Sequence, residues 1–344
     1  MAESITIIGG GLAGLTLGIG LCQRGVPVIL WEAGRYPRHR VCGEFISGGG
    51  QSSLARLGLL GGLQKAGVGS AGSAAFFNGK AMVGARPLPA AALCVSRFVL
   101  DEWLACEFRR LGGELRLGTR WSGTFGPGIV RATGRRAEPV TDGWRLFGLK
   151  VHARGVALKA DLEMHFVPSG YVGLCRLAGG EVNICGLFRS KAVVPDLAQR
   201  WRDWLGGPAA SVLHSRLADA RFDEGSFCSV AALCLRPQRA TQRNQCCVGD
   251  ALTMIPPVTG NGMSMAFESA ELAIEPLAEF SHGQLTWDGA QHLIATRCDK
   301  RFAPRLFWAA WVQRALFQPA ARSALMFLAA RSKWFWRGIF GWTR

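Results

Sequence analysis

Hydrophobic residues follow two kinds of pattern, one at the two ends of the chain and another in its middle. Near the start, the apolar run ITII at residues 5–8 breaks into glycines and resumes with a helical spacing that stops near Gly25. A second apolar run covers residues 26–31, and Glu32 follows it. This order predicts a strand, a tight turn, a helix and a second strand parallel to the first.

The middle of the chain alternates apolar and polar residues, as antiparallel strands do. Residues 74–83, AAFFNGKAMV, predict a hairpin that turns at Asn78-Gly79. Residues 144–188 continue the pattern, with Leu162, Met164 and Phe166 alternating, so a second sheet with one buried face is expected. Further expected elements are helices at residues 100–111, 195–204 and after Gly262, strands at residues 115–117, 129–132, 228–235 and 246–248, and a helical C-terminal region interrupted at Pro304 and Pro319.

Three glycines in the first turn carry a chemical signal. Gly9, Gly11 and Gly14 have the GxGxxG spacing, which permits a tight turn, close approach of the backbone to a pyrophosphate, and close packing of a helix on a strand. The phosphates would lie at the helix N-terminus, where unpaired N–H groups favour negative charge. The pattern therefore predicts a dinucleotide site, and a glycine-rich turn in another kind of α/β protein is the alternative.

Residues on either side of this turn extend the predicted site. Leu12 and Ala13 begin the helix whose N–H groups would face the phosphates. Glu32 stands at the end of the second strand, close to the separation at which an acid binds an adenosine ribose. Together these residues predict that the site holds an ADP moiety.

A second group of candidate residues lies far along the chain. Asp250 ends a short late strand, and Gly260, Asn261 and Gly262 precede a long helix that continues with Met263. Carboxyl ends of parallel strands and helix N-termini line one crevice, so Asp250 can accept hydrogen bonds from a polyol linker. The helix would direct its positive end at the group beyond, where a reduced flavin carries negative charge. The cofactor that this geometry predicts is FAD.

Four segments carry a family resemblance. They are GGGLAG with Glu32, the segment at residues 96–104 that begins with Ser96-Arg97, VGDA at residues 248–251, and PPVTGNGM at residues 256–263. Up to about residue 280, the chain resembles the flavoprotein family that contains aromatic hydroxylases, flavin-dependent halogenases and geranylgeranyl reductases. RVCGEFIS at residues 40–47, with GYVGLCRL and VNICGLF, is most similar to the geranylgeranyl reductase-like branch.

The resemblance implies an α/β fold in which a Rossmann-type FAD-binding domain carries an inserted antiparallel β-sheet substrate domain and a helical C-terminus. The expected ranges are 1–72, 96–143 and 240–285 for the FAD-binding domain, 73–95 and 144–239 for the substrate domain, and 286–344 for the helical region. By resemblance Glu32 would bind the ribose, Arg97 the flavin or its phosphates, Asp250 the ribityl chain and residues 260–263 the isoalloxazine edge, with Arg40 also binding cofactor.

Two family motifs are missing. Hydroxylases of the family carry a stretch like GADG, and the comparable residues 131–139 here read RATGRRAEP, which weakens the hydroxylase interpretation. The halogenase WxWxIP motif is absent, so halogenation is not expected. No second GxGxxG follows, so NADPH or NADH would have to bind transiently as electron donor, or a separate flavin reductase would supply electrons.

Three residues are candidates for chemistry on the substrate. Cys42 and Glu44 would lie near the flavin ring by resemblance, although a loop cysteine is often a small buried hydrophobe and a loop acid is often solvated. Tyr171 is one of only two tyrosines, and its hydroxyl could donate to a substrate oxygen, with core packing as the default interpretation. His152 and His165 lie on expected strands and are interpreted as hydrogen-bonded sheet residues.

Composition adds information about partners. The 344 residues carry a net charge of +16, and between residues 297 and 344 ten Lys and Arg face the single acid Asp299. Nucleic acid and membrane surfaces both attract such a segment, with solubility as the simplest explanation. Because aromatic residues interleave with the cations after Arg331, we expect no nucleic acid and a peripheral contact with anionic membrane or a lipid-like substrate. For the aromatic residues between Phe307 and Phe317, packing on the sheet or an oligomer contact is expected instead.

The cellular location follows from the same composition. The N-terminus lacks the cations of a signal peptide, and no apolar stretch is long enough to span a bilayer, so a cytoplasmic protein is expected. Eleven cysteines occur without a CxxC pair, which gives no support to a metal site or a disulfide framework.

The sequence as a whole predicts an FAD-dependent oxidoreductase. Two reactions compete: hydroxylation of an aromatic or polyketide-like lipophilic small molecule, placed slightly ahead, and reduction of a carbon–carbon double bond. A non-catalytic, flavin-binding and membrane-associated accessory protein is a further alternative.

Overall fold

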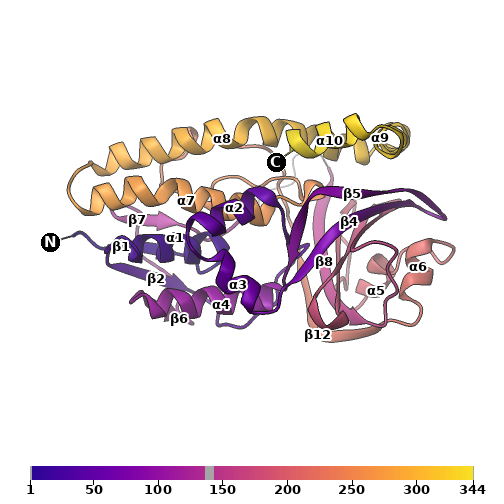
Figure 1. Ribbon diagram of the computed structural model, residues 1–344, viewed down its shortest axis with the longest axis horizontal. Coiled ribbons are helices and arrows are strands. Elements are labelled where there is room, and N and C mark those ends of the chain that lie inside the picture. Colours follow the sequence, from indigo (N-terminus) through magenta and orange to yellow (C-terminus); the bar gives the residue numbers. More distant parts are fainter. Residues whose placement is uncertain (1, 136–142, 344) are drawn as a thin grey trace.

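The structure is a computed structural model that describes residues 2–135 and 143–343. Met1, residues 136–142 and Arg344, which fall in the expected ranges 1–72, 96–143 and 286–344, lie outside the described part. Figure 1 shows a small sheet at one end, a larger curved sheet at the other, and long helices running along one side of both.

The smaller sheet forms around the first strand. β1 (Ile5–Ile8) lies between β2 (Val28–Glu32) and β7 (Ile129–Arg131), β6 (Glu114–Leu117) pairs with β2, and every pairing is parallel. α1 (Leu12–Cys22) is apolar on all sides because it packs against β2, α4 (Arg97–Arg110) and α7 (Gly262–Ser281). The predicted strand–turn–helix–strand unit is therefore confirmed.

The larger sheet has eight strands among the described residues, in the order β12-β8-β11-β10-β9-β4-β5-β3. All neighbours are antiparallel except the parallel pair β4 and β9. The strands are β3 (Phe45–Ile46), β4 (Gly69–Asn78), β5 (Ala81–Cys94), β8 (Arg145–Arg154), β9 (Leu162–Val167), β10 (Gly170–Arg176), β11 (Val182–Ser190) and β12 (Arg221–Val230). The predicted hairpin at Asn78-Gly79 joins β4 to β5, and β3 and residues 69–72 also belong to this sheet.

The remaining helices complete the two halves. They are α2 (Gly48–Arg56), α3 (Leu60–Lys65), α5 (Trp201–Leu205), α6 (Val212–Leu217), α8 (Trp287–Leu316), α9 (Pro319–Arg331) and α10 (Lys333–Trp342). In Figure 1, α5 and α6 lie at the far end of the larger sheet, and α8, α10 and α9 run along the upper side from the smaller sheet to β5. No helix among the described residues is both long and apolar enough to cross a membrane.

Several expected elements differ from the structure for local reasons. The helix predicted at residues 195–204 is only α5, because Asp196 has φ +50°, outside helical conformation. The strand predicted at residues 228–235 ends at Val230, since Ala232 has φ +52°. The strand predicted at residues 246–248 is a single parallel bridge between Arg131 and Cys247.

Candidate cofactor and substrate site

The three glycines of the first turn meet three different steric requirements. Gly9 has φ +113°, and a Cβ there would lie 2.3 Å from the carbonyl oxygen of Ala132. A Cβ on Gly14 would lie 2.0 Å from the Gly9 carbonyl oxygen, so this glycine serves helix packing. A Cβ on Gly11 would meet no atom within 4 Å, because the residue faces an open cavity.

A polar cavity of about 550 Å³ lies in front of this turn. Several distant parts of the chain form its wall: the turn itself with Glu32, the loop at residues 39–45, Arg97, residues 132–135 and 228–230, and the segment from Val248 to Ala266. The wall includes every expected cofactor-binding residue except Gly14 and Asn261, namely Gly9, Gly11, Leu12, Ala13, Glu32, Arg40, Arg97, Asp250, Gly260, Gly262 and Met263. We refer to this space as the polar cavity.

Glu32 is buried and hydrogen-bonded at one end of the polar cavity. Its carboxylate accepts hydrogen bonds from the N–H groups of Gly10 at 2.8 Å and Gly34 at 2.7 Å, and pairs with Arg38 at 2.6 Å. Burial alone would raise the pKa of Glu32, but Arg38 and the two N–H groups lower it to about 2. Glu32 is thus a fixed anion that holds the turn, with lone pairs left for a further donor.

Asp250 faces the polar cavity from the other side, in a position that is open to the cavity but surrounded by protein. Burial raises the pKa of its carboxyl group, against the opposing charges of Arg97 and Arg135. Arg97 is held by a bidentate pair with the buried Asp101, at 2.6 and 2.8 Å, which raises the pKa of its guanidinium group further. Opposite charges therefore converge on the middle of the cavity.

Asn261 has a role that the sequence did not predict. Its Oδ1 accepts a hydrogen bond from Ser47 at 2.9 Å, and its Nδ2 donates to the carbonyl oxygen of Thr343 at the end of α10. Its side chain therefore lies outside the wall of the polar cavity and ties the C-terminus to the loop before α7. Gly260 is left-handed, with φ +65°, and a Cβ there would overlap the ring of Phe45.

Glu44 is the centre of a buried ionic cluster, so the alternative of a solvated loop acid is wrong. Its carboxylate is fully buried and lies 2.6 Å from Nε2 of His152 and 3.5 Å from Nζ of Lys150. It also accepts from the Arg97 N–H at 2.9 Å. Burial would raise the pKa of Glu44, but His152, Lys150 and the Arg97 N–H lower it. Nδ1 of His39 lies 2.9 Å from Lys150 and extends the cluster to the cavity wall.

The two strand histidines are paired as the sequence predicted. His152 bridges Glu44 and Glu181, the latter at 3.1 Å, and His165 lies 2.8 Å from Glu163. Both imidazoles are at least 97% buried and hydrogen-bonded within the sheet.

Cys42 lies on the wall between two cavities. Burial raises the pKa of its thiol, although the nearby Arg97 charge opposes this shift. The thiol is therefore neutral at physiological pH and accepts a weak hydrogen bond from the Glu44 N–H at 3.5 Å. It can donate a proton, but it lacks the thiolate character of a nucleophile.

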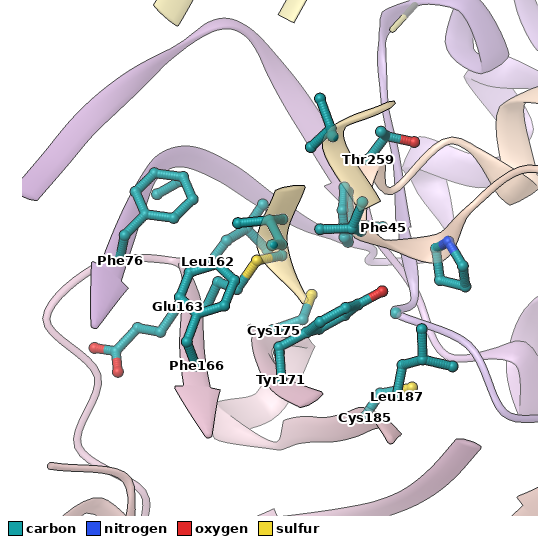
Figure 2. Close-up of a pocket in the computed structure, with 18 of the residues that line it drawn as sticks. Phe45, Phe76, Leu162, Glu163, Phe166, Tyr171, Cys175, Cys185, Leu187 and Thr259 are labelled. Atoms are coloured by element: carbon teal, nitrogen blue, oxygen red, sulfur yellow. The ribbon is translucent and has the colours of Figure 1, made fainter. Parts of the chain in front are cut away.

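An apolar cavity of about 300 Å³ adjoins the polar cavity and is lined by the larger sheet, the loop before α7, and the C-terminal helices. Leu162, Met164 and Phe166, the alternating residues of β9, all line it. Figure 2 shows Phe76 and Phe166 among these side chains, with the carboxylate of Glu163 directed away from them. This space is shaped for a largely hydrocarbon group.

Tyr171 supplies a polar group to the apolar cavity. Its side chain is buried, and its hydroxyl donates a long hydrogen bond of 3.3 Å to Oε1 of Gln313 on α8. Burial raises the pKa of Tyr171 well above its ordinary value, so the hydroxyl stays protonated. In Figure 2 the hydroxyl points toward the side on which Phe45 and Thr259 lie. The ring of Tyr171 packs in a buried apolar cluster with Phe166 and Leu187, as the default interpretation expected, and the residue also lines the apolar cavity.

The two cavities share part of their walls, and some of the shared residues were not expected from the sequence. Those named in the sequence analysis are Cys42 and Asp250; the others include Val41, Phe45, Arg135, Val230, Met254 and Pro257. Arg135 could have been suspected, since it follows directly on the strand-ending Ala132-Thr133-Gly134, all of which line the polar cavity. The apolar members carry no signal that separates them from ordinary core residues.

Comparison with solved structures identifies the fold. p-Nitrophenol 4-monooxygenase PnpA from Pseudomonas putida matches with a TM-score of 0.77 at 17% identity, over 98% of this chain and 96% of that chain. A geranylgeranyl bacteriochlorophyll reductase-like protein from Thermoplasma acidophilum matches with a TM-score of 0.75 at 15% identity, over 96% and 91%. The flavin-dependent brominase Bmp2 matches with a TM-score of 0.72 at 15% identity, over 100% and 94%.

The chain has the fold of these flavin-dependent enzymes. The expected fold class, a Rossmann-type domain with an inserted antiparallel sheet and a helical C-terminus, is thereby confirmed. A family model described as squalene epoxidase matches residues 208–293, which include Asp250 and the whole of α7. No curated protein sequence matches the chain significantly.

Proposed function

We propose that the protein is an FAD-dependent oxidoreductase, and specifically a monooxygenase that hydroxylates a lipophilic small molecule such as an aromatic or polyketide-like compound. The observation that carries this proposal is the shared wall of the two cavities. A polar cavity built for a dinucleotide opens beside an apolar cavity, so the reactive end of the cofactor and a hydrophobic substrate can meet at Cys42, Phe45 and Asp250.

The polar cavity fits FAD in its donor groups. No side chain caps the N-terminus of α1 or of α7, so their first N–H groups are left for a ligand. Gly11 leaves open space at the first of these ends. Arg97 and Arg135 would face phosphate or flavin oxygens, Asp250 would accept from ribityl hydroxyls, and Glu32 would bind the ribose.

The protein's own residues account for the remaining requirements of oxygen insertion. When bound, FAD would supply the two-electron reduction that activates dioxygen. The apolar walls exclude water from the reacting end, and the aromatic side chains of Phe76 and Phe166 hold a hydrophobic substrate by packing. Tyr171 would donate its proton in a hydrogen bond to a hydroxyl or carbonyl oxygen of the substrate and so fix its orientation.

The comparisons support this direction in two ways. The name of PnpA describes a monooxygenase of an aromatic compound, and the squalene epoxidase model describes oxygen transfer to a hydrocarbon. The missing WxWxIP motif argues against halogenation. Two further halogenases, CmlS and PltM, nevertheless match this chain in fold, as the brominase does. NADPH or NADH remains the proposed transient electron donor, with a separate reductase as the alternative.

Reduction of a carbon–carbon double bond is a second candidate. It requires a hydride on one face of the substrate and a proton donor on the other, and Cys42 and Tyr171 are both neutral donors on the cavity walls. The geranylgeranyl reductase-like structure supports it by name.

One experiment separates the candidates. The purified protein should be yellow, should lose its visible absorbance on anaerobic addition of NADPH or dithionite, and should release FAD on acid precipitation. Reduced protein is then mixed with extracts of lipophilic phenols, quinols and prenyl compounds, with and without isotope-labelled dioxygen. We expect a product that contains one labelled oxygen atom and forms only when dioxygen is admitted.

Two results would contradict the proposal. A product that gains two hydrogens without oxygen would establish the reductase interpretation instead. A protein that binds FAD but turns over with no donor or acceptor would point to an accessory role.

A further inference from the structure

The last three helices expose an unusual set of side chains. Among the described residues, six of the eleven exposed large hydrophobic side chains lie on α8, α9 and α10. Exposed cations lie between them along the same helices. We define this set as the C-terminal face: Phe307, Trp311, Arg314, Phe327, Leu328, Arg331, Lys333, Trp334, Arg337 and Trp342. Of the two expectations for the aromatic residues from 307 to 317, packing on the sheet does not hold for Phe307 and Trp311, which are 64% and 48% exposed, and an oligomer contact stays a prediction.

The inner side of α10 accounts for only part of its apolar character. Trp336 packs edge-on against Phe76 at 5.3 Å and donates to the Pro87 carbonyl oxygen at 3.3 Å, and Ile339 lines the apolar cavity. Trp334 lies on the outer side and is 86% exposed. Burial in the fold explains the first group but leaves Trp334 without a role.

The helices are nevertheless fixed in position. Trp342 stacks on Trp308 of α8 at 4.7 Å, and Arg86 of β5 donates to the carbonyl oxygens of Ala329 and Ala330 at the end of α9. In Figure 1 the helices lie side by side along the upper edge of the molecule. These contacts hold α8, α9 and α10, with their exposed aromatic and cationic side chains, in fixed positions along this edge.

The positive charge of the C-terminal face indicates what kind of partner it binds. No Asp or Glu occurs after Asp299, whereas Arg314, Arg331, Lys333 and Arg337 are exposed. A second copy of the chain would bring equal positive charge against this surface, which is unfavourable. An anionic lipid surface supplies the opposite charge and also accepts tryptophan side chains at the depth of its headgroups.

We propose that the C-terminal face docks the protein on an anionic bilayer surface, with Trp334 and Phe327 inserted among the headgroups and the exposed Lys and Arg bound to lipid phosphates. The docking places the helices that wall the apolar cavity, through Trp336 and Ile339, directly against the membrane. This proposal is independent of the reaction, since it rests on residues outside both cavities.

The test uses the full-length protein and vesicle flotation. Vesicles of phosphatidylglycerol and phosphatidylcholine are compared with vesicles of phosphatidylcholine alone. The double variant Lys333→Gln/Arg337→Gln is compared with Lys65→Gln/Arg109→Gln. The second variant removes the same charge from exposed positions on α3 and α4, which lie on the lower side of the molecule in Figure 1, away from α8, α9 and α10. We expect the first variant to bind the anionic vesicles on the order of tenfold or more weakly, since each surface-bound cation contributes about 1 kcal/mol.

A second pair of variants tests the apolar part. Trp334→Ser should weaken vesicle binding, while Val193→Ser, at a residue that is 68% exposed on the loop after β11, should not. Equal binding of all variants, or equal binding to neutral and anionic vesicles, would overturn the proposal. A concentration-dependent dimer that Trp334→Ser abolishes in sedimentation velocity, without vesicle binding, would show instead that the face is an interface between copies.

Discussion

Gly11 decides whether the turn after β1 can hold a ligand or merely forms a turn. Its φ of −86° is open to any residue, and a Cβ there would meet no protein atom. Gly9 and Gly14, by contrast, are required by the fold itself, since a Cβ at either would overlap backbone. A substitution at Gly11 therefore separates cofactor binding from folding.

We predict that Gly11→Leu leaves the fold and thermal stability nearly unchanged and abolishes flavin binding, because the side chain fills the space where a pyrophosphate must approach. The visible spectrum of the purified variant and its titration with FAD measure this. Gly61→Leu, at an exposed and equally unobstructed position on α3, is the control and should bind flavin normally. If Gly11→Leu still binds FAD and is yellow, the pyrophosphate does not bind at this turn.

Substitutions at Tyr171 and its partner can distinguish a role in orienting the substrate from a role in stabilising the cavity wall. We predict that Tyr171→Phe lowers kcat/KM on the order of tenfold, the loss of one hydrogen bond worth about 1.4 kcal/mol, with little change in melting temperature. Gln313→Leu removes the protein acceptor of the same hydroxyl but leaves the hydroxyl in the cavity. If Tyr171 acts on substrate, Gln313→Leu retains the larger share of activity. Equal activity of Tyr171→Phe and the unchanged protein would confine Tyr171 to packing.

At the scale of elements, the helices and strands that form from local sequence were predictable and those that depend on distant contacts were not. α4 begins at Arg97, three residues before its predicted start, because the Ser96 hydroxyl accepts a hydrogen bond from the Val99 N–H. That serine could have been recognised as a cap in the sequence. The left-handed backbone at Asp196 and Ala232, which shortens two expected elements, has no comparable signal because neither residue is a glycine.

α8 shows how a tertiary contact overrides a local rule. Pro304 was expected to interrupt the helical region, yet α8 continues from Trp287 to Leu316. The next residue, Arg305, forms a buried bidentate pair with Glu268 of α7, at 2.7 and 2.9 Å. Arg301, before the proline, also pairs with Glu268 at 2.8 Å, so this carboxylate binds one cation on each side of the proline and favours a continuous helix. Sequence shows neither the partner nor its distance.

At the scale of the whole molecule, the candidate site is an arrangement of remote segments. The polar side of the site was largely predictable, because glycine turns and strand-ending acids have fixed places in a parallel sheet. Its apolar side was not, since Phe45, Met254 and Trp336 become wall residues only through the packing of the larger sheet and α10. Asn261 illustrates the same limit: its place in the TGNG segment suggested flavin contact, but its amide holds Thr343 and so fixes α10 over the site.

The ionic cluster beside the polar cavity links the stability of the whole molecule to pH. Burial and the charge of Lys150, whose Nζ lies 2.9 Å from Nδ1 of His39, together lower the pKa of His39 from 6.5 to about 4. Between pH 6.5 and about 4, His39 therefore binds a proton in the unfolded chain but not in the folded chain. The stability that depends on neutral His39 is fully present above pH 6.5 and is lost as the pH falls toward 4.

Carboxyl groups whose pKa is lowered in the folded chain affect stability at more acidic pH. The pKa of Glu32 is about 2 in the folded chain, against an ordinary value of 4.5. Its contribution to the free energy of unfolding is therefore present above pH 4.5 and is lost as pH falls toward 2. On the acid side of neutrality we therefore predict a melting temperature that declines first between pH 6.5 and about 4 and declines more steeply below pH 4.5. His39→Gln should flatten the first decline and leave the second, because it keeps a polar side chain beside Lys150 but removes the titrating group. Thermal melts across this range measure both. A first decline that persists unchanged in His39→Gln would assign it to another group.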